Sequence, residues 1–177
     1  NTAPCIAYAA FKIHNQNPKA NMIVAPSDHL IINEKAFVEV VKKGMQATMK
    51  NNILLTIGIL ASRPDTGYGY IQFNDLKLKS NTPIKKVKTF TEKPNQELAL
   101  QFLDSGDFLW NSGIFIWSSD TIIKAFEKHL SDIYDIFKQG EKHYSTSTEN
   151  NYINKMFPTC QNISIDYGIM EKSDSVY

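Results

Sequence analysis

Short apolar runs that stop abruptly constrain the fold of this chain more than any other feature. Met22–Ala25 ends on Pro26, and Ile53–Ile59 is too short for a core helix and rich in strand-forming residues. We therefore predict two buried strands, the second of them central in a sheet. Helical patterns that begin at Thr2 and at Asn33 flank the first strand. This alternation is typical of an α/β sheet covered by helices on both faces.

A carboxylate follows the first of these strands. Asp28 and His29 stand two and three residues beyond Pro26, which cannot extend a sheet ladder. Ligands of α/β sheets collect beyond the carboxyl ends of strands, so Asp28 is placed where a metal ion or a ribose would be held. The alternative is a simple turn in which Asp28 bonds its own backbone, and the spacing alone leaves both interpretations open.

Length and composition limit the classes of protein to consider. The 177 residues suffice for one domain with a core, or for a piece of a larger protein. Lys and Arg (19) nearly balance Asp and Glu (18), so no overall charge favours a nucleic acid or a membrane surface. No apolar run approaches the roughly 20 residues of a membrane span, and no signal peptide is visible, so we expect a cytoplasmic protein. The distant Cys5 and Cys160 are interpreted as core thiols.

Two further segments place polar groups at strand ends. Gly69 lies between two tyrosines, where a missing side chain would let a ligand approach the backbone; a tight turn is the alternative. Glu92 and Lys93 end a strand predicted over Lys85 to Thr91. They could bond a sugar hydroxyl and neutralise a phosphate, or form a solvated pair of little energetic value. A helix is predicted after them, with Asn95 as its cap and Gly106 at its end.

The remaining candidates lie in the C-terminal half. Asn111 interrupts the apolar run Phe108–Trp117, and a buried amide is costly unless neighbouring backbone or a ligand satisfies it. Residues 139–151 are polar and rich in Ser and Thr, which predicts a surface loop. A short strand is expected to lead to Asp166, with a helix carrying Glu171 after it; a helix cap at Asp166 is the alternative.

Six of these blocks, in this order, resemble the sugar-phosphate nucleotidyltransferases, and among them the bacterial mannose-1-phosphate guanylyltransferases. The matching blocks are Asn1-Thr2-Ala3-Pro4, Ala25-Pro26-Ser27-Asp28-His29, Thr56-Ile57-Gly58-Ile59 with Gly67-Tyr68-Gly69-Tyr70-Ile71, Phe90-Thr91-Glu92-Lys93-Pro94, Trp110-Asn111-Ser112-Gly113-Ile114-Phe115, and residues 164–172. Independent turns and caps would not fall into one family's order by chance.

The resemblance implies a fold and a reaction. The fold is a Rossmann-like, mixed-sheet domain of three α/β/α layers, and residues 1–177 would form one such domain, incomplete at both ends. The reaction joins α-mannose 1-phosphate to GTP, releases diphosphate and gives GDP-mannose, with Mg²⁺ required. The sugar phosphate attacks the α-phosphorus in line, and the protein contributes positioning and charge neutralisation. A homo-oligomer is one option that the sequence leaves open.

The resemblance also implies roles for individual residues. Asp28 would be the magnesium ligand, and Lys93 would face the sugar phosphate. The other implied contacts are with the substrates: Asn1, Thr2 and Pro4 near guanine and ribose, and Gly69, Glu92, Asn111 and Asp166 around the mannose.

The chain departs from the family pattern at its ends. The family's glycine-rich triphosphate loop and its second metal-binding acid have no counterpart between Asn1 and Tyr177. We therefore expect a piece of a longer enzyme that has little activity when isolated. The alternatives are a catalytically silent nucleotide-sugar-binding or assembly module, and a related pyrophosphorylase that uses another sugar or base.

Overall fold

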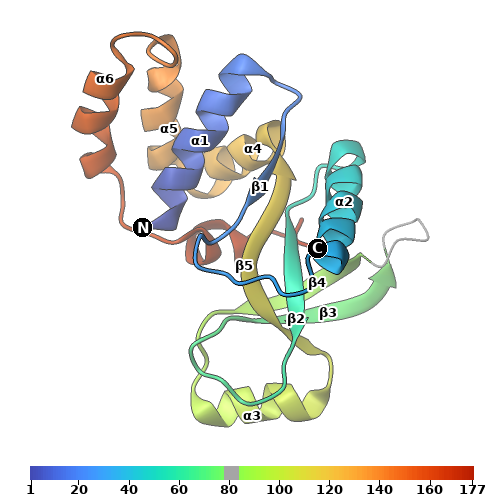
Figure 1. The fold of residues 1–177 in the computed structure, drawn as a ribbon. Coiled ribbons are helices and arrows are strands. Elements are labelled where there is room, and N and C mark those ends of the chain that lie inside the picture. The colour runs from blue at the N-terminus through green and yellow to red at the C-terminus, as the bar shows by residue number, and fades with distance from the viewer. Residues whose placement is uncertain (78–83) are drawn as a thin grey trace. The chain divides into compact units, whose positions relative to one another are not determined.

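The computed structural model describes residues 1–77 and 84–177, which form a mixed α/β fold with an open sheet (Figure 1). Its contacts divide the chain into two compact units. Unit 1 comprises Asn1–Met22 and Trp117–Ser173, and unit 2 comprises Ile23–Ile116 and Asp174–Tyr177. Strand β1 (Asn21–Val24) and strand β5 (Phe108–Ser118) each have residues in both units. The prediction that residues 1–177 form a single domain stays a prediction.

Unit 1 is helical. Its helices are α1 (Thr2–Gln16), α4 (Ser119–His129), α5 (Ser131–Gln139) and α6 (Glu149–Met156). Helix α1 begins as the sequence predicts, with Asn1 Oδ1 accepting a hydrogen bond from Thr2 N and with proline in the first turn. Its buried face packs on α4 and α5. Short apolar faces on several helices therefore build one core.

Aromatic rings fill much of that core. Phe137 of α5 is fully buried and lies 6.1 Å from the ring of Tyr8 and 6.5 Å from that of Phe11, measured between centroids. The hydroxyl of buried Tyr144 donates to Phe137 O at 2.7 Å. Burial raises the pKa of Tyr144, so this hydroxyl remains a donor at all ordinary pH values.

The surface loop predicted over residues 139–151 is confirmed in part: most of these residues are exposed, and residues 143–148 form turns. The segment contains a 3-10 turn, Gly140–Lys142, and the start of α6, and it buries Tyr144 and Glu149. The carboxylate of Glu149 accepts hydrogen bonds from Lys12 Nζ at 2.7 Å, from Ser145 N at 2.8 Å and from the Tyr8 hydroxyl. These donors, Lys12 first, lower the pKa of Glu149 to about 2. Polarity in sequence did not mean exposure here, because distant residues satisfy the buried charge.

Unit 2 contains most of the sheet. Its strands are β2 (Leu55–Leu60), β3 (Tyr70–Lys77), β4 (Lys85–Thr91) and most of β5, and the whole sheet has the order β1-β5-β3-β4 with β2 also paired to β5. Strand β5 pairs antiparallel with both β2 and β3. Strand β2 therefore confirms the strand predicted over Ile53–Ile59, and it has hydrogen-bonded neighbours on both sides, β5 and residues 175–177.

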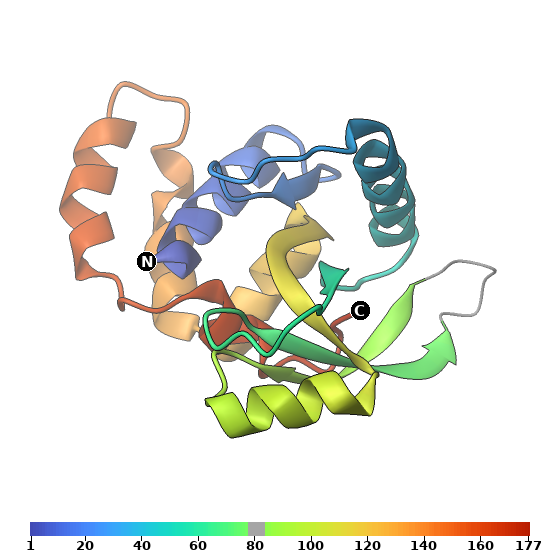
Figure 2. The same ribbon diagram turned by 60° about the horizontal axis from the view of Figure 1, so that its bottom comes forward.

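Two helices cover unit 2. Helix α2 (Glu34–Lys50) packs through Ala47 on Leu55 and Ile116, and helix α3 (Gln96–Ser105) packs through Ala99 on Tyr70 and Trp110. Figures 1 and 2 show them at different ends of this part of the sheet. Both begin at predicted asparagine caps, Asn33 and Asn95, whose side chains accept hydrogen bonds from Ala36 N and Leu98 N respectively. Helix α3 ends at Gly106, whose φ of +74° suits a residue without Cβ.

Three smaller expectations have mixed outcomes. No strand leads to Asp166; residues Asp166–Met170 form a π-helical turn, and Glu171 follows it. Both cysteines are free, and the prediction of core thiols is wrong for Cys5, which is exposed. Across the described ranges 1–77 and 84–177, no helix is both long and apolar enough to cross a membrane.

Candidate functional site

A cavity of about 530 Å³ lies in unit 2 next to the turn that follows β1. Asp28 and His29, in that turn, are exposed and line it. The cavity wall is completed by apolar and polar residues of α2, β2 and β5 and of the loops beside them: Leu30, Ile31, Phe37, Ile57, Ile59, Tyr68, Trp110, Asn111, Ser112 and Ile114. Asp28 and Asn111 thus line the same cavity.

The side chain of Asn111 has a defined orientation. Its Oδ1 accepts hydrogen bonds from Thr56 Oγ1 at 2.9 Å and from Gly113 N at 3.1 Å. Two donors on the same atom identify it as the oxygen of the amide. Gly113 has a φ of +70°, a conformation that favours glycine and that turns its N–H toward Asn111. These two hydrogen bonds therefore fix the orientation of the Asn111 amide.

Gly69 brings two of the predicted site residues together. Its carbonyl accepts a hydrogen bond from Asn111 N at 2.7 Å. A Cβ placed on Gly69 would collide with Glu92 Oε2 and would lie 3.3 Å from Asn111 Cβ. The sequence suggested that glycine lets a group come close to the backbone here, and the group that does so in the structure is the Glu92 carboxylate. Gly69, Glu92 and Asn111 therefore form one contact group.

The Glu92–Lys93 pair lies at the end of β4. Lys93 Nζ lies 3.6 Å from Glu92 Oε1, and the side chains are 60% and 13% exposed respectively. Lys93 has a φ of +48°, a left-handed conformation that is uncommon for a residue other than glycine and that costs about 1 kcal/mol. The strained backbone holds a solvated lysine beside a mostly buried carboxylate. The structure thus gives the two residues different surroundings, although they are adjacent in sequence.

An arginine that the sequence did not single out lies by the aromatic wall. Arg63 Cζ lies 5.2 Å from the Trp110 ring centroid and 6.0 Å from that of Tyr68. Its guanidinium bonds Asp65 Oδ2 at 2.6 Å, which raises the pKa of Arg63. The Gly67 N–H and Arg63 lower the pKa of Asp65. An Arg-Pro-Asp turn resembles any exposed loop, so only the fold reveals this cation.

The other predicted residues lie in unit 1, close to one another. Asn1 is exposed and caps α1, while Pro4 is buried in its first turn. Thr2 Oγ1 accepts a hydrogen bond from Ile165 N at 2.9 Å, next to the partly buried Asp166. The first residues of the chain and the segment before Asp166 are therefore joined, although about the whole length of the chain separates them.

The chemistry of unit 2 suits a polar, phosphorylated ligand. The Glu92 carboxylate, the Asn111 amide and the backbone of Gly69 can all hydrogen-bond hydroxyl groups, and Asn111 lines the cavity. Lys93 lies beside Glu92, and Arg63 lies beside Trp110 of the cavity wall, so both add positive charge. The exposed Asp28 is a hard oxygen donor of the kind that Mg²⁺ uses together with substrate phosphates. Within residues 1–77 and 84–177, no three His, Cys, Asp or Glu side chains form a group that could hold a metal ion. Asp28 therefore fits a magnesium ion as a single protein ligand.

Comparison with known proteins defines the class. Residues 1–154 match the family model described as nucleotidyl transferase. Since this match includes most of the chain, the chain belongs to the nucleotidyl transferase family.

Individual relatives show which members of this family the chain is similar to. The chain is 35% identical over 178 residues to the alginate biosynthesis protein AlgA of Pseudomonas fluorescens, a match with 98% of this chain and 36% of the relative. It is 33% identical over 181 residues to mannose-1-phosphate guanylyltransferase 2 of Escherichia coli O157:H7, a match with 98% of this chain and 37% of the relative. The chain thus spans little more than a third of the length of these relatives.

Solved structures share the fold. The crystal structure of a protein named mannose-1-phosphate geranyltransferase from Thermus thermophilus superposes with a TM-score of 0.84 at 26% identity. The superposition covers 99% of this chain and 48% of that one. The predicted Rossmann-like, mixed-sheet α/β class of nucleotidyltransferases is confirmed by this likeness and by the family match.

Proposed function

We propose that this chain is the sugar-binding part of a mannose-1-phosphate guanylyltransferase, which forms GDP-mannose and diphosphate from GTP and α-D-mannose 1-phosphate. The observation that supports this most is the contact group Gly69–Glu92–Asn111 beside a cavity lined by Asp28. Its chemistry suits a sugar whose hydroxyls need both donors and acceptors. The names of the relatives from Escherichia coli suggest the sugar and the base.

The reaction is a direct displacement at phosphorus. An oxygen of the sugar phosphate attacks the α-phosphorus of GTP, and diphosphate leaves from the opposite side. No covalent intermediate with the protein is required, so the chain contributes orientation and charge neutralisation. Magnesium, when bound, supplies positive charge against the phosphate oxygens, and Asp28 is the residue of this chain that would hold it.

Each residue of the contact group has a proposed task. The Glu92 carboxylate accepts hydrogen bonds from sugar hydroxyls, and the backbone amide of Gly69 donates to one. Asn111 is oriented for the same sugar by Thr56 and Gly113. Lys93, left mostly to solvent, neutralises the sugar phosphate.

The residues of unit 1 have proposed substrate contacts of their own. Asn1, Thr2 and Pro4 bind near the guanine and its ribose, and Asp166 binds near the mannose. The hydrogen bond from Ile165 N to Thr2 Oγ1 supports this grouping, because it holds the first turn of α1 beside the segment that leads to Asp166. We propose that the isolated 177-residue chain has little activity, since the triphosphate loop of the family lies outside it.

A diphosphate-release assay on the full-length protein tests the proposal. The assay uses GTP, Mg²⁺ and a panel of sugar 1-phosphates that includes mannose, glucose and fucose 1-phosphate. We expect release with mannose 1-phosphate and its loss in Asp28→Asn, which removes a charge with little change of volume. Asp104→Asn, the same change at an exposed position of α3, is the control and should keep full activity.

Two results would contradict the proposal. Retained turnover of Asp28→Asn at saturating Mg²⁺ would remove Asp28 from the metal site. A folded full-length protein that binds GDP-mannose but releases no diphosphate with any sugar phosphate would instead establish a silent nucleotide-sugar-binding module. A preference for another sugar 1-phosphate would keep the reaction class and change the substrate.

A further inference from the structure

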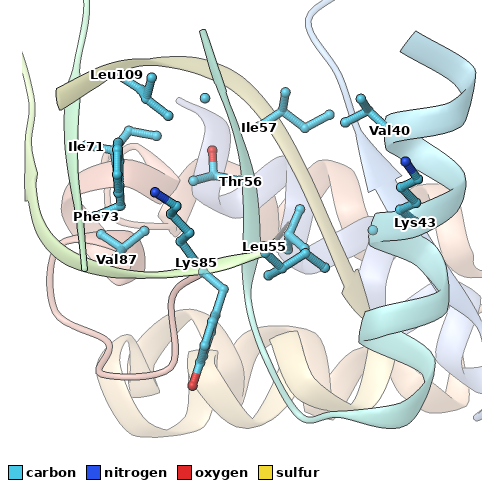
Figure 3. A pocket seen from close by; sticks show the side chains of 14 residues that line it. Val40, Lys43, Leu55, Thr56, Ile57, Ile71, Phe73, Lys85, Val87 and Leu109 are labelled. Atoms are coloured by element: carbon cyan, nitrogen blue, oxygen red, sulfur yellow. The ribbon is translucent and has the colours of Figure 1, made fainter. Parts of the chain in front are cut away.

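A second cavity of unit 2, of about 400 Å³, shares only Ile57 of its lining with the cavity beside Asp28. Figure 3 shows Val40 and Lys43 of α2 on one side of β2, and Ile71, Phe73 and Val87 on the other. The lining is mostly apolar, and it includes Ile57 and Gly58 of β2, Lys85 of β4 and the C-terminal Tyr177. An apolar hollow of this size in one unit calls for an occupant, because protein interiors are close-packed.

The last residues of the chain form a short strand beside this cavity. Leu54 N donates to Ser175 O and Tyr177 N donates to Leu54 O, both at 2.9 Å. Thr56 N donates to Tyr177 O, also at 2.9 Å. These alternating bonds are those of a parallel pair, and Leu54 and Val176 form its bridge.

The same segment is bonded on its other side to β4. Val87 N donates to Val176 O at 3.0 Å, and Val176 is only 2% exposed. Residues Ser175–Tyr177 therefore lie between β2 and β4. Beyond Tyr177, β2 continues to Leu60 and β4 extends back to Lys85, and residues of both strands line the cavity there. The cavity therefore lies where residues after Tyr177 would continue the pairing with β2 and β4.

We propose that this cavity receives a β-strand formed by the residues that follow Tyr177 in the longer protein. Three observations favour that occupant over others. Residues 175–177 run toward the cavity and are already hydrogen-bonded to β2 on one side and to β4 on the other. The lining is apolar, as the surroundings of a buried internal strand are. The relatives are much longer than this chain, with 36% to 37% of their length matched.

The hydrogen-bond pattern fixes the register of the proposed strand. In a parallel pair every second N–H of a strand donates to the same neighbour. On β2 these donors are Leu54 N and Thr56 N, and Gly58 N is the next one. Gly58 N would donate to the carbonyl of the second residue after Tyr177, and the N–H of that residue would donate to Thr56 O. Its side chain would share a face with Tyr177, Leu55 and Ile57, which pack together beneath α2. We therefore expect that residue to be apolar.

Disulfide trapping in the full-length protein tests this register. Ile57→Cys is combined with cysteine at the second residue after Tyr177, where neighbouring strands bring the two Cα atoms to a distance that suits a disulfide. We expect oxidation to give an intramolecular bond in most of the protein. The matched control has Ile57→Cys and cysteine at the first residue after Tyr177, whose side chain points to the opposite face. It should give at least ten-fold less of that bond.

Hydrogen exchange supplies a second measurement that needs no cysteine. Proline at the second residue after Tyr177 removes the N–H that would bond Thr56 O. We expect amide exchange in β2, read from peptides that contain Gly58, to become at least ten-fold faster in this variant. Alanine at the same position should keep the exchange rate of β2 within about two-fold of the unsubstituted protein. Peptides of α1 in unit 1 should exchange at the same rate in all forms.

Three outcomes would overturn the proposal. Equal trapping by the two cysteine pairs would show that no defined strand lies there, and unchanged exchange in the proline variant would show the same. A disulfide that joins two molecules would assign the cavity to a second copy of the protein. A reading frame that ends at Tyr177 would leave no segment to fill it.

Discussion

Each unit of the chain contains a mostly buried glutamate next to a lysine, and the two pairs differ in how they are held. In unit 1, Lys12 Nζ lies 2.7 Å from Glu149 Oε1, and Tyr8 and Ser145 also donate to the same carboxylate. In unit 2, Lys93 Nζ lies 3.6 Å from Glu92 Oε1, and the lysine is 60% exposed. Residues from distant parts of the chain therefore hold the Lys12–Glu149 pair in place. Glu92 and Lys93, in contrast, are neighbours in sequence and lie near a cavity.

The difference extends to the surroundings of the two pairs. Around Glu149 the rings of Tyr8, Tyr144 and Phe137 pack together, and Phe137 is fully buried. Near the site of unit 2, Leu60 and Tyr68 are 80% and 43% exposed, and a cavity of about 530 Å³ adjoins Asn111. Unit 1 uses its polar groups to complete a core, whereas unit 2 presents them to a space that a ligand can enter. Substitutions in the two units should therefore affect different properties.

The largest effect on stability is expected from Phe137→Ala in the core of unit 1. Removing this buried ring should lower the free energy of unfolding by about 3–5 kcal/mol, through lost burial and the cavity left behind. This loss is measured by urea unfolding monitored with circular dichroism. Leu60→Ala, at an exposed position of β2, is the control and should change stability by less than about 0.5 kcal/mol. Equal losses in the two variants would show that the units are packed alike.

Gly69→Ala should have the largest effect on the proposed site. The added methyl group would collide with the Glu92 carboxylate and displace it from its position beside Gly69. In the full-length enzyme we expect kcat/KM to fall about a hundred-fold, equivalent to about 2.7 kcal/mol of transition-state binding. Gly67→Ala is the neighbouring control, since its methyl group would meet only Asp65 Oδ1, at 3.2 Å. If both variants kept normal kinetics, the contact of Gly69 with Glu92 would have no role in turnover.

Glu149→Gln tests the locked pair and its pH dependence. Loss of the charge-assisted hydrogen bonds should lower the free energy of unfolding by about 2 kcal/mol at pH 7. Because the pKa of Glu149 is lowered to about 2 in the folded state, its contribution is complete above the ordinary carboxyl range near 4.5 and is lost as the pH falls toward 2. Stability curves of the two forms should therefore converge over that interval.

The matched change in unit 2 is Glu92→Gln. We expect it to reduce turnover of the full-length enzyme while costing less stability than Glu149→Gln, because Lys93 is 60% exposed and solvent screens its attraction to Glu92. A larger loss of stability for Glu92→Gln than for Glu149→Gln would reverse the comparison between the units.

The smallest effect is expected from Thr56→Val. The variant keeps the shape of the side chain but removes the hydroxyl that donates to Asn111 Oδ1 at 2.9 Å. We expect a loss of about 1 kcal/mol in the free energy of unfolding and a rise of several-fold in KM for the sugar phosphate, as Asn111 becomes free to rotate. Thr56→Ser, which retains the hydroxyl, should restore the KM. A normal KM in Thr56→Val would show that the Thr56 hydroxyl is not needed to orient the amide.

Local signals in the sequence predicted much of the fold. The strand over Lys85–Thr91 has the predicted bounds, and the asparagine caps at Asn33 and Asn95 and the glycine end at Gly106 are all confirmed. These features depend on backbone conformations and hydrogen bonds within a few residues. The order of short motifs also identified the family, because each motif is a compact segment that can be read without knowing its neighbours.

Long-range contacts explain what was missed. Nothing near Glu149 in sequence predicts its burial, since its strongest partner, Lys12, is 137 residues away. The central position of β5 depends on pairings with β2 and β3 that the apolar pattern of β2 could not reveal. Residues 161–164, which precede the π-helical turn at Asp166–Met170, are irregular and do not form the predicted strand, for which a period of two residues was weak evidence.

The sequence by itself determined the kinds of element, their caps and the candidate residues of the site, because those follow from local conformational preferences. Only the tertiary structure decided which candidates meet. It brought Gly69, Glu92 and Asn111 into contact, added Thr56 and Arg63, and placed Thr2 beside the segment that leads to Asp166. The physical reason is that these contacts join residues tens to more than a hundred positions apart, and their geometry arises from packing of the whole chain.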